Sequence, residues 1–261
     1  MKKILTIAGS DPSGGAGIQA DLKTFTAFTH YGMSVITSLT AQNTTGVSGI
    51  FDVTPEFIKM QMDSVFSDIF PDGVKIGMLS NSDTINAVAD KLSEYCPENI
   101  VADTVMVSTS GSRLLSENAI DSLCKRIFPL AKIITPNIPE AQVLSGVKIL
   151  NTNDMITAAK KISAHFKGAV LIKGGHLEDS ADDLLFADDT IQWFTAKKIN
   201  NPNTHGTGCT LSSAIACGLA EGLSVFDSVK KAKDYVNGAI DFGLDLGKGS
   251  GPLNHMYKIK S

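Results

Sequence analysis

The stretch KILTIAGSDPSGGAGIQADLKTFTAF, residues 3–28, passes from an apolar run through a glycine-rich turn into a segment with helical spacing. Residues 3–9 are mostly apolar and end in glycine, which predicts a short buried strand. After the turn, apolar side chains recur at the spacing of a helix, at Ile18, Leu22, Phe25 and Phe28. This stretch therefore predicts the first strand, loop and helix of an α/β fold.

The same alternation continues along the chain. Runs rich in apolar and β-branched residues predict strands at 33–41, 73–77, 99–103, 131–135 and 169–175, and helical patterns separate them at 54–70, 83–95, 117–128 and 154–166. Residues 182–196 predict a hairpin with Asp188 and Asp189 near its turn, and a final amphipathic helix covers 224–244. We therefore predict an α/β fold with a mostly parallel central sheet and helices on both faces. No repeat or linker divides the chain, so we expect residues 1–261 to form a single domain.

Composition limits the classes of function. The 261 residues carry a net charge of −4, so there is no basic surface that would predict a nucleic-acid partner or a membrane-bound state. No apolar run reaches the length of a membrane span. The four cysteines have no zinc-binding spacing. We therefore expect free thiols in a cytoplasmic protein.

Polar or glycine-rich motifs follow the predicted strands in turn. They are GSDPSGGAG (9–17), TAQNTTG (40–46), GMLS (77–80), ADTVM (102–106), TPNIPE (135–140) and KGGH (173–176). Ligands of wound α/β sheets bind at the carboxyl ends of the strands, so this shared edge is the expected site. Neither the GxxxxGK[ST] loop nor the GxGxxG fingerprint occurs, which disfavours a P-loop enzyme and a dinucleotide-dependent oxidoreductase.

The segment NTHGTGC, residues 203–209, has two interpretations. Gly206 and Gly208 precede a small apolar run that predicts a buried helix. Unpaired N–H groups at a helix start bind anions and lower the pKa of a nearby thiol. The alternative is a tight helix entry in which Cys209 is a small core residue.

The acids at the strand ends also have two interpretations. Asn137 and Glu140 fit a helix-capping pattern around Pro139, and Asp103 fits a turn. Two acids at neighbouring strand ends also suit a hydrated Mg²⁺ ion, which takes few protein carboxylates. Lys173, at the next strand end, fits either a phosphate contact or a solvated surface position.

Together, these motifs resemble the hydroxymethylpyrimidine/phosphomethylpyrimidine kinase family of thiamin biosynthesis, within the ribokinase-like fold. The matching segments span nearly the whole chain in order: TIAGSDPSGGAGIQADLKTF, YGMSVITSLTAQNTTGV, KIGML, DTVM, ITPNIPEA, IKGGHL, THGTGCTLSSAIA and GKGSGPLNH. The resemblance implies phosphoryl transfer from ATP, with Mg²⁺, to 4-amino-5-hydroxymethyl-2-methylpyrimidine and then to its monophosphate. It also implies a homodimer.

The resemblance further implies the roles of single residues. Cys209 corresponds to the base that takes the hydroxymethyl proton, and the anion hole corresponds to Gly206, Thr207 and Gly208 with it. Gln42 corresponds to the residue that recognises the aminopyrimidine edge. A carboxamide offers the donor and acceptor that complement this edge. Alternatively, the Gln42 side chain only stabilises a turn. The rest of the implied substrate side is Met78, Gly9, Gly15 and Asp21. The implied Mg²⁺–ATP side is Lys173, Asp103, Glu140 and Asn137, with Asp103 and Glu140 near the metal through water.

Three other functions remain as alternatives. A pyridoxal or pyridoxine kinase is the nearest, because vitamin B6 also has a hydroxymethyl group and a ring nitrogen, but the glutamine of AQNT favours the pyrimidine. A non-catalytic module that only binds a pyrimidine is disfavoured by the complete set of motifs. A sugar kinase is disfavoured because Asp11 and Asp21 are the only evident carboxylates to read hydroxyl groups.

Overall fold

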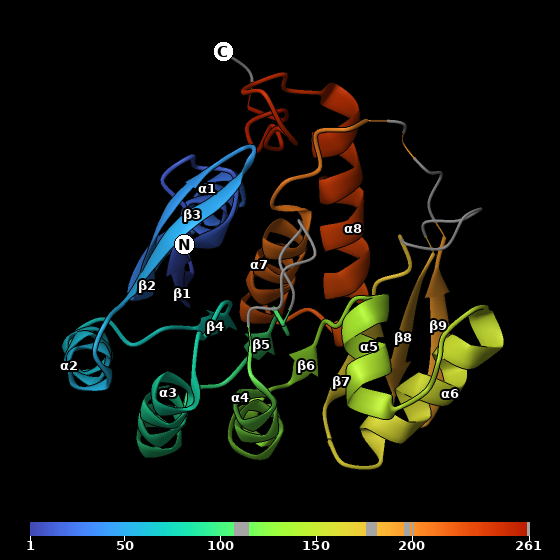
Figure 1. Cartoon of the computed structure of the whole chain (residues 1–261), viewed down its shortest axis with the longest axis horizontal. Coiled ribbons are helices and arrows are strands. Elements are labelled where there is room, and N and C mark those ends of the chain that lie inside the picture. The colour runs from blue at the N-terminus through green and yellow to red at the C-terminus, as the bar shows by residue number, and fades with distance from the viewer. Residues whose placement is uncertain (107–114, 176–181, 196–198, 200, 260–261) are drawn as a thin grey trace.

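The computed structural model describes residues 1–106, 115–175, 182–195, 199 and 201–259 (Figure 1). His176 of the KGGH motif lies outside this set. The strands are β1 (Lys3–Ser10), β2 (Tyr31–Asn43), β3 (Gly46–Asp52), β4 (Gly73–Ile76), β5 (Ile100–Ala102), β6 (Ile133–Ile134), β7 (Ala169–Ile172), β8 (Asp183–Ala187) and β9 (Thr190–Phe194). The α-helices are α1 (Gly17–Ala27), α2 (Pro55–Phe66), α3 (Ser82–Tyr95), α4 (Glu117–Ser122), α5 (Ile138–Ser145), α6 (Thr152–Ser163), α7 (Thr207–Ala220) and α8 (Val225–Phe242). Among the described helices, none is long and apolar enough to cross a membrane.

The strands form one sheet in the order β3-β2-β1-β4-β5-β6-β7-β8-β9. Strands β2, β1, β4, β5, β6 and β7 are parallel to one another, whereas the pairs β2–β3, β7–β8 and β8–β9 are antiparallel. The prediction of a mostly parallel sheet is therefore confirmed. Because the six parallel strands point the same way, the segments that follow them emerge at one edge.

Alternate side chains of the strands point into two separate cores. Leu5 and Ile7 of β1 pack into the core beneath α2–α6, whereas Ile4 packs into the core beneath α1, α7 and α8. This alternation is the period of a strand buried on both faces. Helices cover both faces, as predicted, and Figure 1 shows α7 and α8 together on one side of the sheet.

The start of the helix predicted from residue 54 and the turn of the predicted hairpin are confirmed. Thr54 caps α2, with its side chain accepting a hydrogen bond from the Phe57 amide, and Pro55 is the first helical residue. Asp188 and Asp189 join β8 to β9 with φ angles of 47° and 59°, and this pair of left-handed residues gives the twist that a two-residue hairpin turn needs.

Two elements differ from the prediction. The strand predicted at 33–41 extends through residues 42–43 as part of β2, which turns back at residues 44–45 into the unpredicted strand β3. β3 is an edge strand with most side chains exposed, so it lacks the apolar run by which a buried strand is found. The predicted helix over 117–128 is α4 for its first part and continues as a π-helical turn over Leu123–Ile127.

A buried ion pair and its hydrogen bonds join four elements of the fold. Asp21 of α1 accepts hydrogen bonds from Thr6 of β1 (2.6 Å), Lys75 of β4 (2.8 Å) and Ser213 of α7 (2.7 Å). Both Asp21 and Lys75 have 0% exposed side chains. Burial alone would lower the pKa of Lys75, but the attraction of Asp21 outweighs it and raises that pKa above its ordinary value, so the lysine is charged.

We predict that Asp21→Asn lowers the free energy of unfolding by about 3–5 kcal/mol, because it leaves a buried ammonium group without its counter-charge. Urea denaturation measures this. Asp121→Asn is the control, since the Lys125–Asp121 pair is exposed on both sides and is worth less than about 1 kcal/mol. Equal small losses in the two variants would contradict the prediction.

Candidate active site

Helix α7 begins at the centre of the predicted edge, against the glycine-rich loop. Gly206 precedes its first turn with a φ of 84°, and a Cβ there would collide with the carbonyl oxygen of Gly15. A Cβ on Gly15 would collide with the ring of His205. Gly206 and Gly15 are thus required for close packing. This agrees with a tight helix entry, the simpler interpretation of residues 203–209. No side chain of the described residues caps α7. The Thr207 amide donates to the carbonyl oxygen of Thr204, which leaves the amides of Gly208 and Cys209 as candidate donors to an anion.

Lys173 and Asp103 lie beside this helix start. Nζ of Lys173 donates a 3.0 Å hydrogen bond to Oδ1 of Asp103, and the side chain of Ser212 in α7 lies 3.3 Å from Oδ2. A Cβ on Gly208 would lie 3.4 Å from Nζ of Lys173 and 3.5 Å from Oδ2 of Asp103. The strand-end acid, the lysine and the helix start therefore form one cluster.

The electrostatics of this cluster keep both charges. Burial would raise the pKa of Asp103, but Lys173 and Lys75 outweigh it and lower that pKa. Burial would likewise lower the pKa of Lys173, but Asp103 and then Glu140 raise it. Lys173 is therefore a fixed cation at the strand ends rather than a solvated surface lysine.

Glu140 forms the predicted helix cap and also binds the segment that follows β5. Asn137 and Glu140 make a reciprocal capping box at the start of α5. The same carboxylate also accepts hydrogen bonds from the Thr104 hydroxyl (2.7 Å) and the Met106 amide (3.1 Å). Glu140 thus ties α5 to the segment after β5, directly next to Asp103.

We tested whether these acids suit Mg²⁺. In the part of the chain that the structure describes, no group of three or more potential metal ligands occurs. Both carboxylates already accept hydrogen bonds from protein donors. Hard oxygen donors of this kind suit a Mg²⁺ ion that keeps its own water and contacts the protein through it, and they do not form a direct cage.

The thiol of Cys209 departs from the sequence-based expectation. A helix start predicts a lowered pKa, whereas the pKa of Cys209 is raised to about 11. Burial is the main cause, Lys75 opposes it, and the negative charges of Asp21 and Asp103 add to it. At neutral pH, Cys209 is a neutral thiol, half-buried at the helix start.

Asp21 does not face a ligand. Its carboxylate is fully buried and accepts hydrogen bonds from three protein donors, as described above. This differs from the position on the substrate side that the resemblance implied. The reason is that Asp21 points inward from α1 toward Lys75, a partner 54 residues away that local sequence does not reveal.

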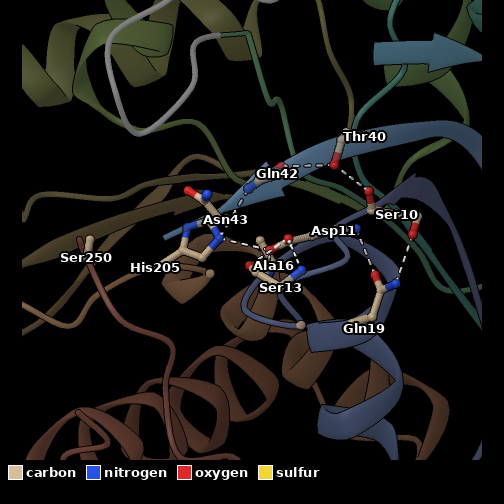
Figure 2. Close-up of polar contacts among 12 residues, drawn as sticks. Ser10, Asp11, Ser13, Ala16, Gln19, Thr40, Gln42, Asn43, His205 and Ser250 are labelled. Atoms are coloured by element: carbon tan, nitrogen blue, oxygen red, sulfur yellow. Dashed lines mark hydrogen bonds and ion pairs between the residues drawn. The ribbon is translucent and has the colours of Figure 1, made fainter. Parts of the chain in front are cut away.

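Gln42 lies near the start of α7, whereas Gly9 and Met78 lie together at the end of β1. Gln42 is half-buried at the end of β2, and Figure 2 shows its side chain between Thr40 and His205. A Cβ on Gly9 would lie 3.7 Å from the sulfur of Met78, so these two residues are neighbours. The structure therefore brings Gln42 to His205 and the start of α7, and Met78 to the end of β1.

Sequence analysis did not find the pair Asp11 and His205. Nε2 of His205 lies 2.9 Å from Oδ2 of Asp11, and Asp11 also accepts hydrogen bonds from Ser13 and from the Ala16 amide. Burial would raise the pKa of Asp11, but the hydrogen bonds from His205 and Ser13 hold it well below its ordinary value. The signal was available, since His205 directly precedes the GTGC motif, but its partner lies 194 residues away.

The glycine-rich tail has a structural role that its sequence did not reveal. Thr44, at the tip of the β2–β3 hairpin, accepts hydrogen bonds from the amides of Lys248 and Gly249. The amide of His205 donates to the carbonyl oxygen of Gly251. The tail therefore links the hairpin that carries Gln42 to the segment that begins α7, and Figure 1 shows these parts meeting.

Comparisons with known proteins agree with this architecture. A family model described as phosphomethylpyrimidine kinase matches residues 11–254. The hydroxymethylpyrimidine/phosphomethylpyrimidine kinase of Escherichia coli (strain K12) is 48% identical over 98% of this chain and 99% of that protein. The thiamine biosynthesis bifunctional protein ThiED of Geobacter sulfurreducens is 50% identical over 97% of this chain, which spans only 52% of that longer protein. The solved structure of Bacillus subtilis pyridoxal kinase with ADP has a TM-score of 0.91 and 37% identity, covering 99% of this chain and 98% of that chain.

The mostly parallel sheet and the likeness to the solved pyridoxal kinase define a kinase of the ribokinase-like class. The near full-length match to curated relatives narrows this class. The chain belongs to the phosphomethylpyrimidine kinase family, and it is a kinase of thiamin biosynthesis.

We predict that alkylation of Cys209 by iodoacetamide, followed peptide by peptide in the wild-type protein, accelerates about tenfold per pH unit from pH 7 to 9. With a pKa raised to about 11, the thiolate fraction still grows over this whole range. The exposed Cys96 reports on the reagent in the same samples. A plateau in the Cys209 rate below pH 8 would show a lowered pKa and contradict the structure.

Proposed function

We propose that the enzyme phosphorylates 4-amino-5-hydroxymethyl-2-methylpyrimidine at its hydroxymethyl oxygen and then phosphorylates the monophosphate, both at the start of α7. The single observation that supports this most is the position of that helix start. Lys173 and Asp103 lie beside this helix start. His205, which directly precedes Gly206, contacts Gln42. A phosphate donor and a pyrimidine acceptor would meet there.

In this proposal, the backbone and Lys173 stabilise the transferred group. Phosphoryl transfer depends on positioning and on stabilising spread-out negative charge. The ammonium of Lys173 lies beside the first turn of α7, because a Cβ on Gly208 would lie 3.4 Å from its Nζ. Mg²⁺ held through water near Asp103 and Glu140 would shield the charge of the ATP phosphates.

Cys209 is the proposed proton acceptor in the first reaction only. The nucleophile there is an alcohol, whose proton must leave as the phosphoryl group arrives. The neutral thiol must first release its own proton to solvent, which its partial exposure allows, and the buried Lys75 favours the thiolate. In the second reaction the nucleophile is a phosphate oxygen, already largely ionised at neutral pH because its second pKa is about 6.

Pyridoxal phosphorylation is the second candidate. The pyridoxal kinase of Bacillus subtilis shares the fold of this chain at a TM-score of 0.91, and vitamin B6 also offers a hydroxymethyl group. The carboxamide of Gln42 supports the pyrimidine instead, because it offers a donor and an acceptor to the aminopyrimidine edge.

We also propose a homodimer of single-domain subunits in the cytoplasm. All nine strands of the described residues belong to one sheet, which supports one domain. The edge hairpin exposes large apolar side chains, namely Leu39, Val47, Ile50 and Phe51, and such patches are typical of protein interfaces. All four cysteines are free thiols, as expected in a reducing compartment.

We predict that Cys209→Ala slows the first phosphorylation by ~10²–10⁴-fold, the usual contribution of a positioned base, and slows the second far less. The variant keeps the backbone N–H groups of α7. Initial rates are measured with the alcohol and with the monophosphate, each as sole acceptor.

Cys96→Ala is the matched control, since Cys96 is an exposed thiol at the end of α3. Equal losses in both reactions of Cys209→Ala would mean that the thiol shapes the anion hole and is not the base. No loss in either would remove Cys209 from the site.

A further inference from the structure

The side-chain amide of Gln42 is held at both of its ends. One terminal atom lies 3.3 Å from Oγ1 of Thr40, and the other lies 3.3 Å from Nε2 of His205. Figure 2 draws the amide nitrogen toward His205 and the oxygen toward Thr40. The two ends of an amide have nearly the same shape, and their hydrogen-bond partners decide which is which.

The contact with Thr40 calls for a donor. The Thr40 hydroxyl has a single hydrogen, and it donates that hydrogen to the carbonyl oxygen of Ser10 at 2.8 Å. A carbonyl oxygen can only accept, so this shorter bond fixes the hydroxyl hydrogen. Oγ1 of Thr40 is then an acceptor toward Gln42, and the amide must present its NH₂ group there.

The contact with His205 calls for an acceptor. Nε2 of His205 lies 2.9 Å from the carboxylate of Asp11, whose lowered pKa keeps it ionised. An unprotonated Nε2 would place two lone pairs face to face, so Nε2 carries a hydrogen, whether the imidazole is neutral or charged. A protonated Nε2 has no lone pair to accept from an amide N–H, so Gln42 must present its oxygen there, where it shares the Nε2 hydrogen with the Asp11 carboxylate.

We propose that Thr40, His205 and Asp11 are positioning residues that turn the Gln42 amide so that its oxygen faces His205 and its NH₂ group faces Thr40. The contact with Thr40 and the contact with His205 each indicate this orientation of the amide independently. The opposite placement would set N–H against N–H at His205 and oxygen against oxygen at Thr40, and would leave both contacts unsatisfied.

This orientation has a consequence for how the substrate binds, and that consequence rests on the proposed function. The amide offers its oxygen on the side of His205, next to the start of α7, and an N–H on the side of Thr40. In the pyrimidine, the ring nitrogen, the amino group and the hydroxymethyl group occupy consecutive ring positions. The amino group would meet the amide oxygen and the ring nitrogen the N–H, so the hydroxymethyl group would lie toward α7 and Cys209. With the opposite orientation of the amide, the hydroxymethyl group would point away from α7 and Cys209.

Nuclear magnetic resonance of the wild-type protein tests the orientation without any activity. The side-chain NH₂ signals of Gln42, assigned by their loss in Gln42→Glu, should show a nuclear Overhauser effect to the Thr40 methyl group and none to the His205 ring protons. Gln61 is the internal control, because its amide nitrogen and oxygen pair with the Ile36 backbone in a fixed sense, at 3.1 and 3.0 Å. An effect to His205 with none to Thr40 would overturn the proposal.

Kinetics test the consequence for specificity. The ratio of kcat/KM for the aminopyrimidine to that for its 4-oxo analogue, which reverses donor and acceptor, should fall roughly tenfold or more in Thr40→Val. Thr40→Ser retains the hydroxyl group and should restore the ratio. A ratio that Thr40→Val leaves unchanged would overturn the role of Thr40 in specificity. A general loss of rate cancels in this ratio, so a merely structural effect of the substitution would leave the ratio unchanged. The proposed function itself would be refuted only if the wild-type protein were inactive on the pyrimidine.

Discussion

The site depends on one buried carboxylate. Asp21 holds β1, β4 and α7 together through its hydrogen bonds to Thr6, Lys75 and Ser213. Ser213 follows Cys209 by one helical turn, so both side chains lie on the same face of α7. The ion pair therefore fixes how α7 meets the sheet, and it places a positive charge close enough to Cys209 to oppose the rise in its pKa.

Most of the remaining site is built from backbone and from a few fixed charges. The close contact between Gly206 and Gly15 brings the first loop of the chain against the start of α7. Asp103 approaches this helix turn from the end of β5, and Lys173 approaches it from the end of β7. This arrangement suits a reaction in which groups are aligned and charge is neutralised, since little covalent chemistry is required of the protein.

The sequence predicts those features that depend on neighbouring residues. The caps at Thr54 and Asn137 and the turn at Asp188 and Asp189 follow from local rules of helix starts and hairpins, and all are present. The edge strand β3 was missed because its side chains are mostly exposed and lack the pattern of a buried strand.

The features that sequence reasoning missed or misjudged involve distant partners. The resemblance placed Asp21 on the substrate side, and local sequence did not reveal its buried partner Lys75, which belongs to β4. The pKa of Cys209 is raised rather than lowered because burial outweighs the helix start, and burial is a property of the assembled fold. The network of Gln42, His205 and Asp11 likewise joins three separate segments.

The most direct test of the account is the substrate preference of the wild-type enzyme. Initial rates with ATP and Mg²⁺ would be measured with the pyrimidine, its monophosphate, pyridoxal and ribose, each supplied alone. The account predicts that both pyrimidines are phosphorylated, that kcat/KM for the pyrimidine exceeds that for pyridoxal, and that ribose is not a substrate. A larger kcat/KM for pyridoxal, or no turnover of the monophosphate, would contradict it.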